Sequence, residues 1–166
     1  KDTHKKIQDL KPRPDLIFTQ EDITGNQLSQ GGAPLEGYLH YEGVCGGESY
    51  ETVGVYYLKK HKGNISFECL RVEPNQEILD WLVTVDRYCV ILARNCLIVT
   101  INGMKIAGLH LEGGRYTDRC IKTSELEKYY KVELMKEVIN HKINLITKAI
   151  DAGASIICGD FNSVYA

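Results

Sequence analysis

The chain has 166 residues, of which 43% are hydrophobic and 25% charged, and its 20 basic and 22 acidic residues give a net charge of −2. This length is enough for one domain with a sizeable core, and the composition is that of an ordinary globular protein. The near-neutral charge gives no electrostatic argument for a polyanionic partner such as nucleic acid. No apolar run approaches the roughly 18 residues of a transmembrane segment. We therefore expect a single domain over residues 1–166.

The six cysteines contain no C-x-x-C pair, and several stand in apolar stretches, where a free thiol behaves as a small hydrophobic group. This pattern favours the cytoplasm or another reducing compartment. Because the count is even, a disulfide-bonded protein of an oxidising compartment stays open as the alternative.

The first part of the chain predicts a short helix followed by strands. A helix over the first ten residues would end before Pro12 and Pro14. DLIFTQE then has the pattern of a buried strand that ends on polar residues. TVGVYYL and ISFECL alternate as antiparallel strands do, and the lysine-rich segment between them predicts a hairpin connection.

The second part predicts further strands around one strong hairpin signal. RYCVILA and NCLIVTI have the composition of strands, with the polar pair Arg94-Asn95 between them. Asn102-Gly103 stands between two apolar runs and predicts a type I′ turn, because both central residues of that turn need a positive φ. The strand after this turn runs out into His110.

A long amphipathic helix and a final strand follow. Ser124 and Glu127 match a capping box at the start of the helix, Gly153 is placed to end it, and SIIC begins the last strand. The order of all these elements predicts an α+β fold with helices packed on sheet faces. The apolar positions of the helix form one stripe, which consists of Val132, Met135, Ile139, Ile143, Ile146 and Ile150.

Three predicted strands, far apart in the sequence, end on polar side chains suited to phosphate or metal chemistry. The first ends on Gln20-Glu21, the second on His110, and the third on Asp160 with Asn162 close behind. Mg²⁺ prefers oxygen ligands and is usually held by one or two carboxylates, which Glu21 and Asp160 can supply. An amide and an imidazole can hydrogen-bond the non-bridging oxygens of a phosphate. These residues therefore suffice for metal-assisted hydrolysis of a phosphoester.

The same residues also have ordinary structural interpretations. Glu21 could be a turn or helix-capping acid, and His110 a structural histidine at a strand end. Asp160 and Asn162 could form an Asx turn. None of these residues, taken singly, distinguishes a catalytic site from a turn.

Two basic segments could contact a phosphate. GGRYTDR, which follows His110, carries Arg115 and Arg119, and its glycines suit a substrate-binding loop as well as an ordinary one. KKHKG is more typical of a solvated loop. Arg115 and Arg119 are therefore the candidate substrate-binding residues.

PDLIFTQE, GLHLEGG and CGDFNS, in this order, resemble motifs of the endonuclease/exonuclease/phosphatase superfamily. The resemblance implies a DNase I-like α/β sandwich, with a mostly antiparallel sheet and helices on its face. It implies that Glu21 binds the metal and that His110 contacts the scissile phosphate. It further implies that Asp160 orients the attacking water while Asn162 steadies the phosphate. The cofactor would be Mg²⁺ or Mn²⁺, and the substrate a phosphodiester of a nucleic acid or a phospholipid headgroup.

The resemblance covers residues 7–163 and lacks two parts of the family's pattern. The first strand, with its metal-binding asparagine, and the C-terminal half, with its closing Asp-His pair, have no counterpart. We therefore expect residues 1–166 to be a partial domain of a longer chain, with little or no activity by itself. The implied function is Mg²⁺-dependent phosphodiester hydrolysis. The alternative is a non-catalytic, degenerate member that serves as a structural or binding module in a larger assembly.

Overall fold

The computed structural model describes residues 2–20, 35–43, 53–77, 80, 94–111 and 125–162. Their order of helices and strands confirms the predicted α+β class. No helix in these ranges is long and apolar enough to span a membrane. The elements are α1 (Asp2–Asp9), β1 (Leu16–Gln20), β2 (Tyr38–Gly43), β3 (Val53–Leu58), the 3₁₀ helix η2 (Lys59–His61), β4 (Ile65–Val72), β5 (Arg94–Ile101), β6 (Met104–His110), α4 (Glu125–Asp151) and β7 (Ile156–Asp160).

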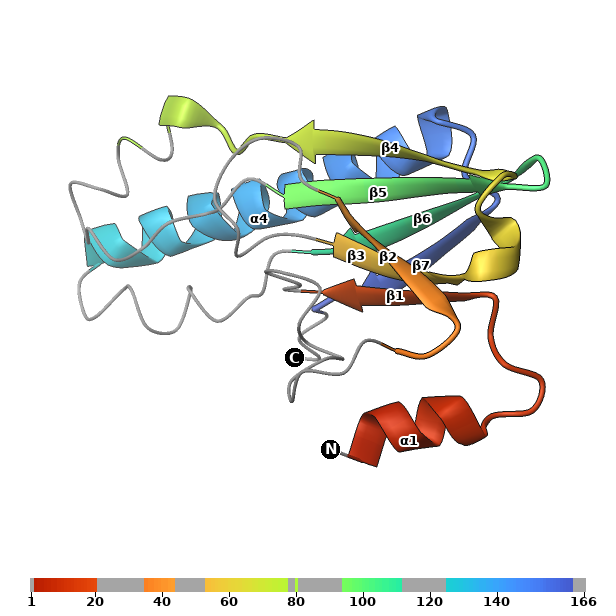
Figure 1. Ribbon diagram of the computed structural model, residues 1–166. Coiled ribbons are helices and arrows are strands. Elements are labelled where there is room, and N and C mark those ends of the chain that lie inside the picture. Colours follow the sequence, from red (N-terminus) through yellow and green to blue (C-terminus); the bar gives the residue numbers. More distant parts are fainter. Residues whose placement is uncertain are drawn as a thin grey trace.

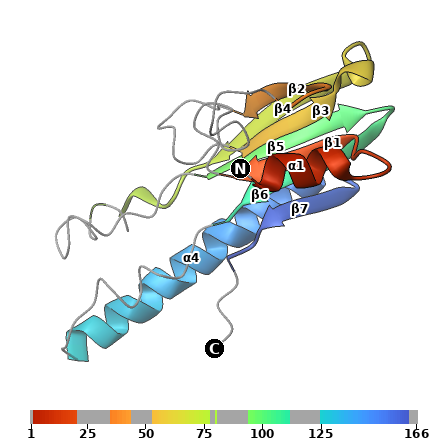
Figure 2. The ribbon, with the colours of Figure 1, turned by 60° about the horizontal axis from the view of Figure 1, so that its bottom comes forward.

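The strands form two sheets that pack face to face, with α4 on the outer face of the second sheet. The first sheet has the order β1-β3-β2 and is antiparallel. The second has the order β4-β5-β6-β7 and is antiparallel except for the parallel pair β6–β7. Figure 1 shows β1–β3 in front of the second sheet and α4 behind it. In the turned view of Figure 2, α4 runs along β6 and β7, while β2 and β3 lie on the opposite side.

Strand β5 lies at the centre of this arrangement because both of its faces are apolar. Leu97 and Val99 pack with Val53 and Val55 of the first sheet. Cys96 and Ile98 point the other way, into a core that includes residues of α4 such as Leu145 and Ala149. A strand buried on both faces reads as a continuous apolar run, and this is the pattern of NCLIVTI.

Two turn predictions are confirmed by the backbone. Asn102 and Gly103 have φ angles of 51° and 78° and join the antiparallel pair β5–β6, as a type I′ turn requires. Gly153 has a φ of 84° and ends α4. The amide of Gly153 donates to the carbonyl of Ile150 (2.8 Å) and that of Ala154 to Ala149 (3.1 Å), which is the Schellman pattern.

The predicted hairpin between TVGVYYL and ISFECL is wrong. Strand β3 is the central strand of the first sheet, where Tyr57 pairs with both Leu16 of β1 and Leu39 of β2. It has no edge left for β4, so the chain crosses through η2 into the second sheet. The connection stays tied to the first sheet, because the amide of Lys59 donates to the carbonyl of Gly37 (3.0 Å).

Arg94 and Asn95, which the sequence suggested as a polar break, lie inside strand β5 and are buried. All of RYCVILA, residues 87–93, lies outside the described residues. The side-chain oxygen of Asn95 has no hydrogen-bond partner within the described structure. An unsatisfied buried acceptor costs about 1–3 kcal/mol, so Asn95 is retained at a cost to stability.

Most of the apolar stripe predicted for α4 is exposed, and of its members only Ile146 packs against the core. Ile139 and Ile143 of that stripe are 52% and 53% exposed, and Val132, Met135 and Ile150 are exposed to similar degrees. The buried face carries Val138, His141, Leu145 and Ala149 instead. It lies roughly 120° around the helix from the predicted stripe, at 3.6 residues per turn.

A buried polar contact and small side chains account for this rotation of α4. His141, which is 2% exposed, donates from Nε2 to the carbonyl oxygen of Val72 on β4 (3.0 Å). Further along the helix, Lys148 donates to the carbonyl oxygen of Arg71 (2.8 Å). Ala149 lies in the same core as Ala107 of β6, and two alanines let helix and sheet approach closely. A pattern that scores only large apolar residues does not detect this face.

Cys69 of β4 is disulfide-bonded. Cys96 and Cys158 are free thiols, so the other half of this disulfide lies outside the described residues. Burial raises the pKa of the Cys96 thiol to about 12 and also raises the pKa of Cys158.

Alkylation of the denatured, unreduced protein is therefore expected to modify Cys96 and Cys158 but not Cys69. Peptide mass spectrometry would measure this, and a sample reduced first should be modified at all three residues.

We also expect Cys69→Ser to lower the free energy of unfolding by about 2–4 kcal/mol. Modification of Cys69 without reductant would contradict the disulfide.

Candidate functional site

The parallel pair β6–β7 places two of the predicted site residues side by side. Both strands end at the same edge of the sheet, and His110 is paired in register with Asp160. The amide of Leu111 donates to the carbonyl of Asp160 (2.9 Å), which extends the pairing one residue beyond β6. His110 is buried and Asp160 is exposed, so the imidazole lies beneath the surface and the carboxylate is accessible to solvent.

Asn162 is held at the same edge by a turn that follows β7. Its backbone amide donates to Oδ1 of Asp160 (2.8 Å), and its side-chain Nδ2 donates to the carbonyl of Leu111 (2.7 Å). Lys142 of α4 donates to the carbonyl of Asn162 (2.8 Å). The Asx turn considered from the sequence is thus present. It also fixes the orientation of both polar side chains beside His110.

Gly159 is required by the approach of β7 to β6 just before the site. Its φ is 139°, a backbone conformation that side chains with a Cβ rarely adopt. A Cβ at this position would lie 1.9 Å from the carbonyl oxygen of Leu109. The glycine of the motif CGDFNS therefore lets the two strand ends that carry His110 and Asp160 lie together.

Strand β1 leads toward the same edge. Leu16 shares a pocket with Ile106 near the start of β6, and a Cβ on Gly108 further along β6 would lie 2.3 Å from the ring of Phe18. In Figure 1, β1, β6 and β7 all run from right to left. Gln20 therefore ends β1 at the edge where β6 and β7 end. Glu21, Arg115 and Arg119 lie outside the described residues, so their predicted roles remain predictions.

Arg94 is a residue of this site that the sequence interpretation missed. It begins β5, and the antiparallel pairing of Cys96 with Leu109 brings it to the end of β6. Its Nη1 lies 3.4 Å from Nδ1 of His110. The only signal in the sequence was a polar pair inside an otherwise apolar run, which resembles a loop between strands.

The donors at this edge are compatible with Mg²⁺ but do not by themselves form a metal centre. The described ranges contain no group of three or more His, Cys, Asp or Glu side chains that could hold a metal ion. Mg²⁺ often binds through only one or two carboxylates and completes its shell with water and phosphate oxygens. The exposed carboxylate of Asp160 matches that kind of site.

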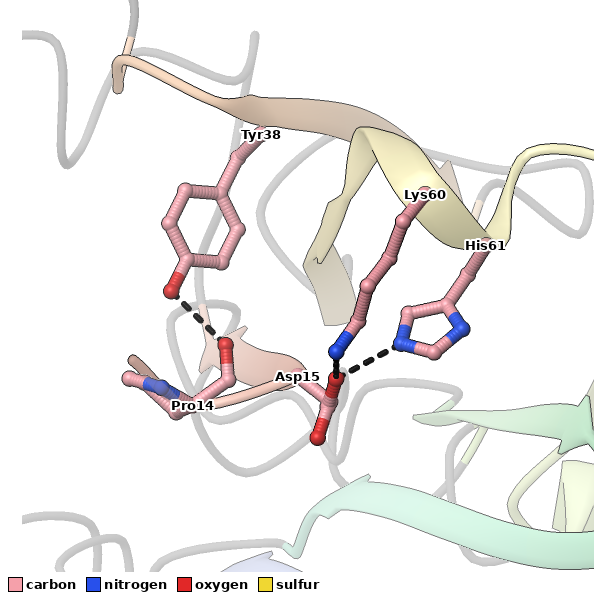
Figure 3. A network of polar contacts seen from close by, with 5 residues as sticks. All are labelled: Pro14, Asp15, Tyr38, Lys60 and His61. Atoms are coloured by element: carbon pink, nitrogen blue, oxygen red, sulfur yellow. Dashed lines mark hydrogen bonds and ion pairs between the residues drawn. The ribbon is translucent and has the colours of Figure 1, made fainter. Parts of the chain in front are cut away.

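A second polar cluster lies at the opposite end of β1. Lys60 and His61 both contact Oδ1 of Asp15, at 2.7 and 2.6 Å, and Figure 3 shows the two side chains converging on it from η2. The hydrogen bond with His61 and, to a smaller extent, that with Lys60 lower the pKa of the Asp15 carboxyl. Tyr38 donates to the carbonyl of Pro14 (2.7 Å) beside them. The segment KKHKG thus makes structural contacts far from the His110 edge.

No protein-family model matches this sequence, and no curated protein matches it. Among solved structures, a D. rerio TDP2 humanized by 14 mutations is similar at 19% sequence identity and a TM-score of 0.41. The match covers 91% of this chain and 50% of that one, so the chain spans about half the length of the structure it matches. A similarity at this level does not establish a fold family. The structure by itself shows an α+β sandwich with His110, Asp160 and Asn162 at one edge.

Proposed function

We propose that this chain carries part of the active site of a Mg²⁺-dependent phosphodiesterase of the endonuclease/exonuclease/phosphatase type. The observation that supports this most is the meeting of His110, Asp160 and Asn162 at one sheet edge. These residues come from two segments about fifty positions apart, and a register pair and a side-chain hydrogen bond join them. The motifs that carry the resemblance, GLHLEGG and CGDFNS, contain all three residues.

In this proposal each residue acts on the phosphate or on the attacking water. Asp160 orients the water and takes its proton as the water oxygen forms a bond to phosphorus. The bond from phosphorus to the ester oxygen breaks on the opposite side, and the leaving oxygen takes a proton from solvent. His110 and Asn162 donate hydrogen bonds to the non-bridging oxygens, where negative charge develops. Glu21 would hold the Mg²⁺, which when bound supplies positive charge against the phosphate. Arg115 and Arg119 would bind the rest of the substrate.

A second candidate function is a non-catalytic interaction module. The observation that favours it is the exposed apolar stripe of α4, because contiguous exposed apolar surface often marks a contact with another protein. For the phosphodiesterase, the proposed substrate is a phosphodiester, which both nucleic acids and phospholipid headgroups contain.

The test is a Mg²⁺ or Mn²⁺ titration of the full-length protein that follows hydrolysis of bis-p-nitrophenyl phosphate. We expect metal-dependent turnover that Asp160→Asn and Glu21→Gln each reduce by at least about 10²-fold, the contribution typical of a positioned acid or base. The matched control is Asp151→Asn, which changes an exposed carboxylate at the end of α4. This variant should keep the activity of the wild type.

Two results would refute the phosphodiesterase. One is full-length protein that neither turns over the substrate nor binds the metal, which would favour the interaction module. The other is turnover that persists in both Asp160→Asn and Glu21→Gln. Circular dichroism of each variant would show that the fold is intact.

A further inference from the structure

A buried arginine lies against His110 at the candidate site. Arg94 and His110 are each 6% exposed, and Nη1 of Arg94 lies 3.4 Å from Nδ1 of His110. An ionised side chain is expensive to bury and is normally retained only where its N–H groups meet acceptors. The contact therefore places a chemical constraint on the imidazole.

This constraint concerns which nitrogen of His110 carries a hydrogen. A guanidinium is always protonated in proteins and has only hydrogen-bond donors. Nδ1 can meet it only as an acceptor, and so without a hydrogen of its own. A doubly protonated ring would set an N–H of one cation against another cation in a buried place. The contact therefore favours a neutral imidazole with its hydrogen on Nε2.

We propose that Arg94 is a positioning residue that holds His110 as the neutral tautomer with its hydrogen on Nε2. In this tautomer Nε2 is a donor, as a hydrogen bond to a phosphate oxygen requires. Nδ1 faces the guanidinium and does not take a proton from water, so His110 acts as a donor and not as the general base. The proposed tautomer rests on the contact with Arg94, whereas its meaning for catalysis rests on the proposed function.

The tautomer can be measured without any activity. In the ¹⁵N-histidine-labelled full-length protein at neutral pH, long-range ¹H–¹⁵N spectra distinguish the two neutral tautomers and the cation. A His110→Asn variant identifies the signals of His110 among the five histidines of the chain. We expect the Nε2–H tautomer in the wild type. The Nδ1–H tautomer or the cation would overturn the proposal.

Substitutions of Arg94 then test its role. Arg94→Met removes the donor and is expected to give a mixture of tautomers or a protonated ring, whereas Arg94→Gln keeps an N–H donor and should keep the Nε2–H tautomer. If Arg94→Met does not fold, the tautomer of His110 in the wild type still tests the proposal, because the Nδ1–H tautomer or the cation would overturn it. The matched control is Arg71→Met, which removes an arginine of β4 that pairs with Glu73. An unchanged tautomer in folded Arg94→Met would overturn the role of Arg94.

Turnover separates this proposal from the proposed function. In an active full-length protein, Arg94→Met should lower kcat by about 10–100-fold, as the loss of a residue that orients a site ligand does, and Arg94→Gln should restore part of it. If the wild type is inactive but His110 is the Nε2–H tautomer, the phosphodiesterase fails and the positioning by Arg94 stands. If the wild type is active and His110 carries its hydrogen on Nδ1, only the positioning fails.

Discussion

Gly159→Ala is expected to lower the free energy of unfolding by about 3–5 kcal/mol, the sum of backbone strain and overpacking. The φ of 139° disfavours any residue with a Cβ, and the new methyl group would lie 1.9 Å from the carbonyl oxygen of Leu109. A backbone atom cannot move aside as the end of a side chain can, so β7 must separate from β6. Urea unfolding followed by circular dichroism measures the loss. The separation would also move Asp160 away from His110, so activity should fall in parallel.

Two other glycines separate the causes of this effect. Gly103 has a φ of 78°, but a Cβ added there would meet no heavy atom within 4 Å, so Gly103→Ala should cost only the backbone strain of about 1–2 kcal/mol. Gly63 has an ordinary φ and equally open surroundings, so Gly63→Ala should stay within about 1 kcal/mol of the wild type. A loss in Gly159→Ala no larger than that in Gly103→Ala would show that β6 and β7 do not approach so closely.

Leu145→Ala is expected to destabilise the protein by about 2–5 kcal/mol, whereas Ile143→Ala should change its stability by less than about 1 kcal/mol. Both residues are large aliphatic positions in the same two turns of α4. Leu145 is fully buried in the core between α4 and the second sheet, while Ile143 is 53% exposed. Truncation of Leu145 leaves a cavity, and truncation of Ile143 removes a side chain that water already contacts. The denaturant midpoint of each variant measures the difference.

A polar pair of variants makes the same comparison more sharply. Ile143→Lys should fold and retain most of the wild-type stability, because its charge can remain in water. Leu145→Lys should not fold stably, since the ammonium group would be buried without a partner. The reverse order in either pair would mean that α4 packs through the stripe predicted from the sequence. In that case, the assignment of Leu145 to the buried face of α4 would be wrong.

Local chemistry in the sequence predicted most individual elements. Asn102-Gly103 and Gly153 each favour a backbone conformation with positive φ. Whether the chain can adopt such a conformation depends on the residues of the turn itself, so a short stretch of sequence is enough to predict it. The prolines that follow α1 and the apolar run of β5 act in the same local way. The strand ends at His110 and Asp160 also come from short segments with clear boundaries. For this reason the residues of the candidate site could be named before their contacts were known.

Their assembly depended on pairings between distant segments. The sequence does not say that β3 is paired on both sides, and therefore β4 was assigned to the wrong partner. Only the register of β6 with β7 brings His110 to Asp160, and only the pairing of β5 with β6 turns Arg94 from an apparent loop residue into a neighbour of His110. Glu21, Arg115 and Arg119 lie outside the described residues, so their predicted roles stay predictions, of which the Glu21→Gln variant tests the first.

The sequence by itself determined the α+β class, the sharp turns and the polar ends of the strands, because each follows from the conformational preferences and polarity of neighbouring residues. Only the tertiary structure decided which face of α4 is buried, which strands share a sheet and which polar groups meet. A hydrophobic pattern gives the period of a helix, but a helix with two apolar faces can pack through either of them. The face that is buried in α4 is the one where small residues and the hydrogen bond from His141 fit the second sheet.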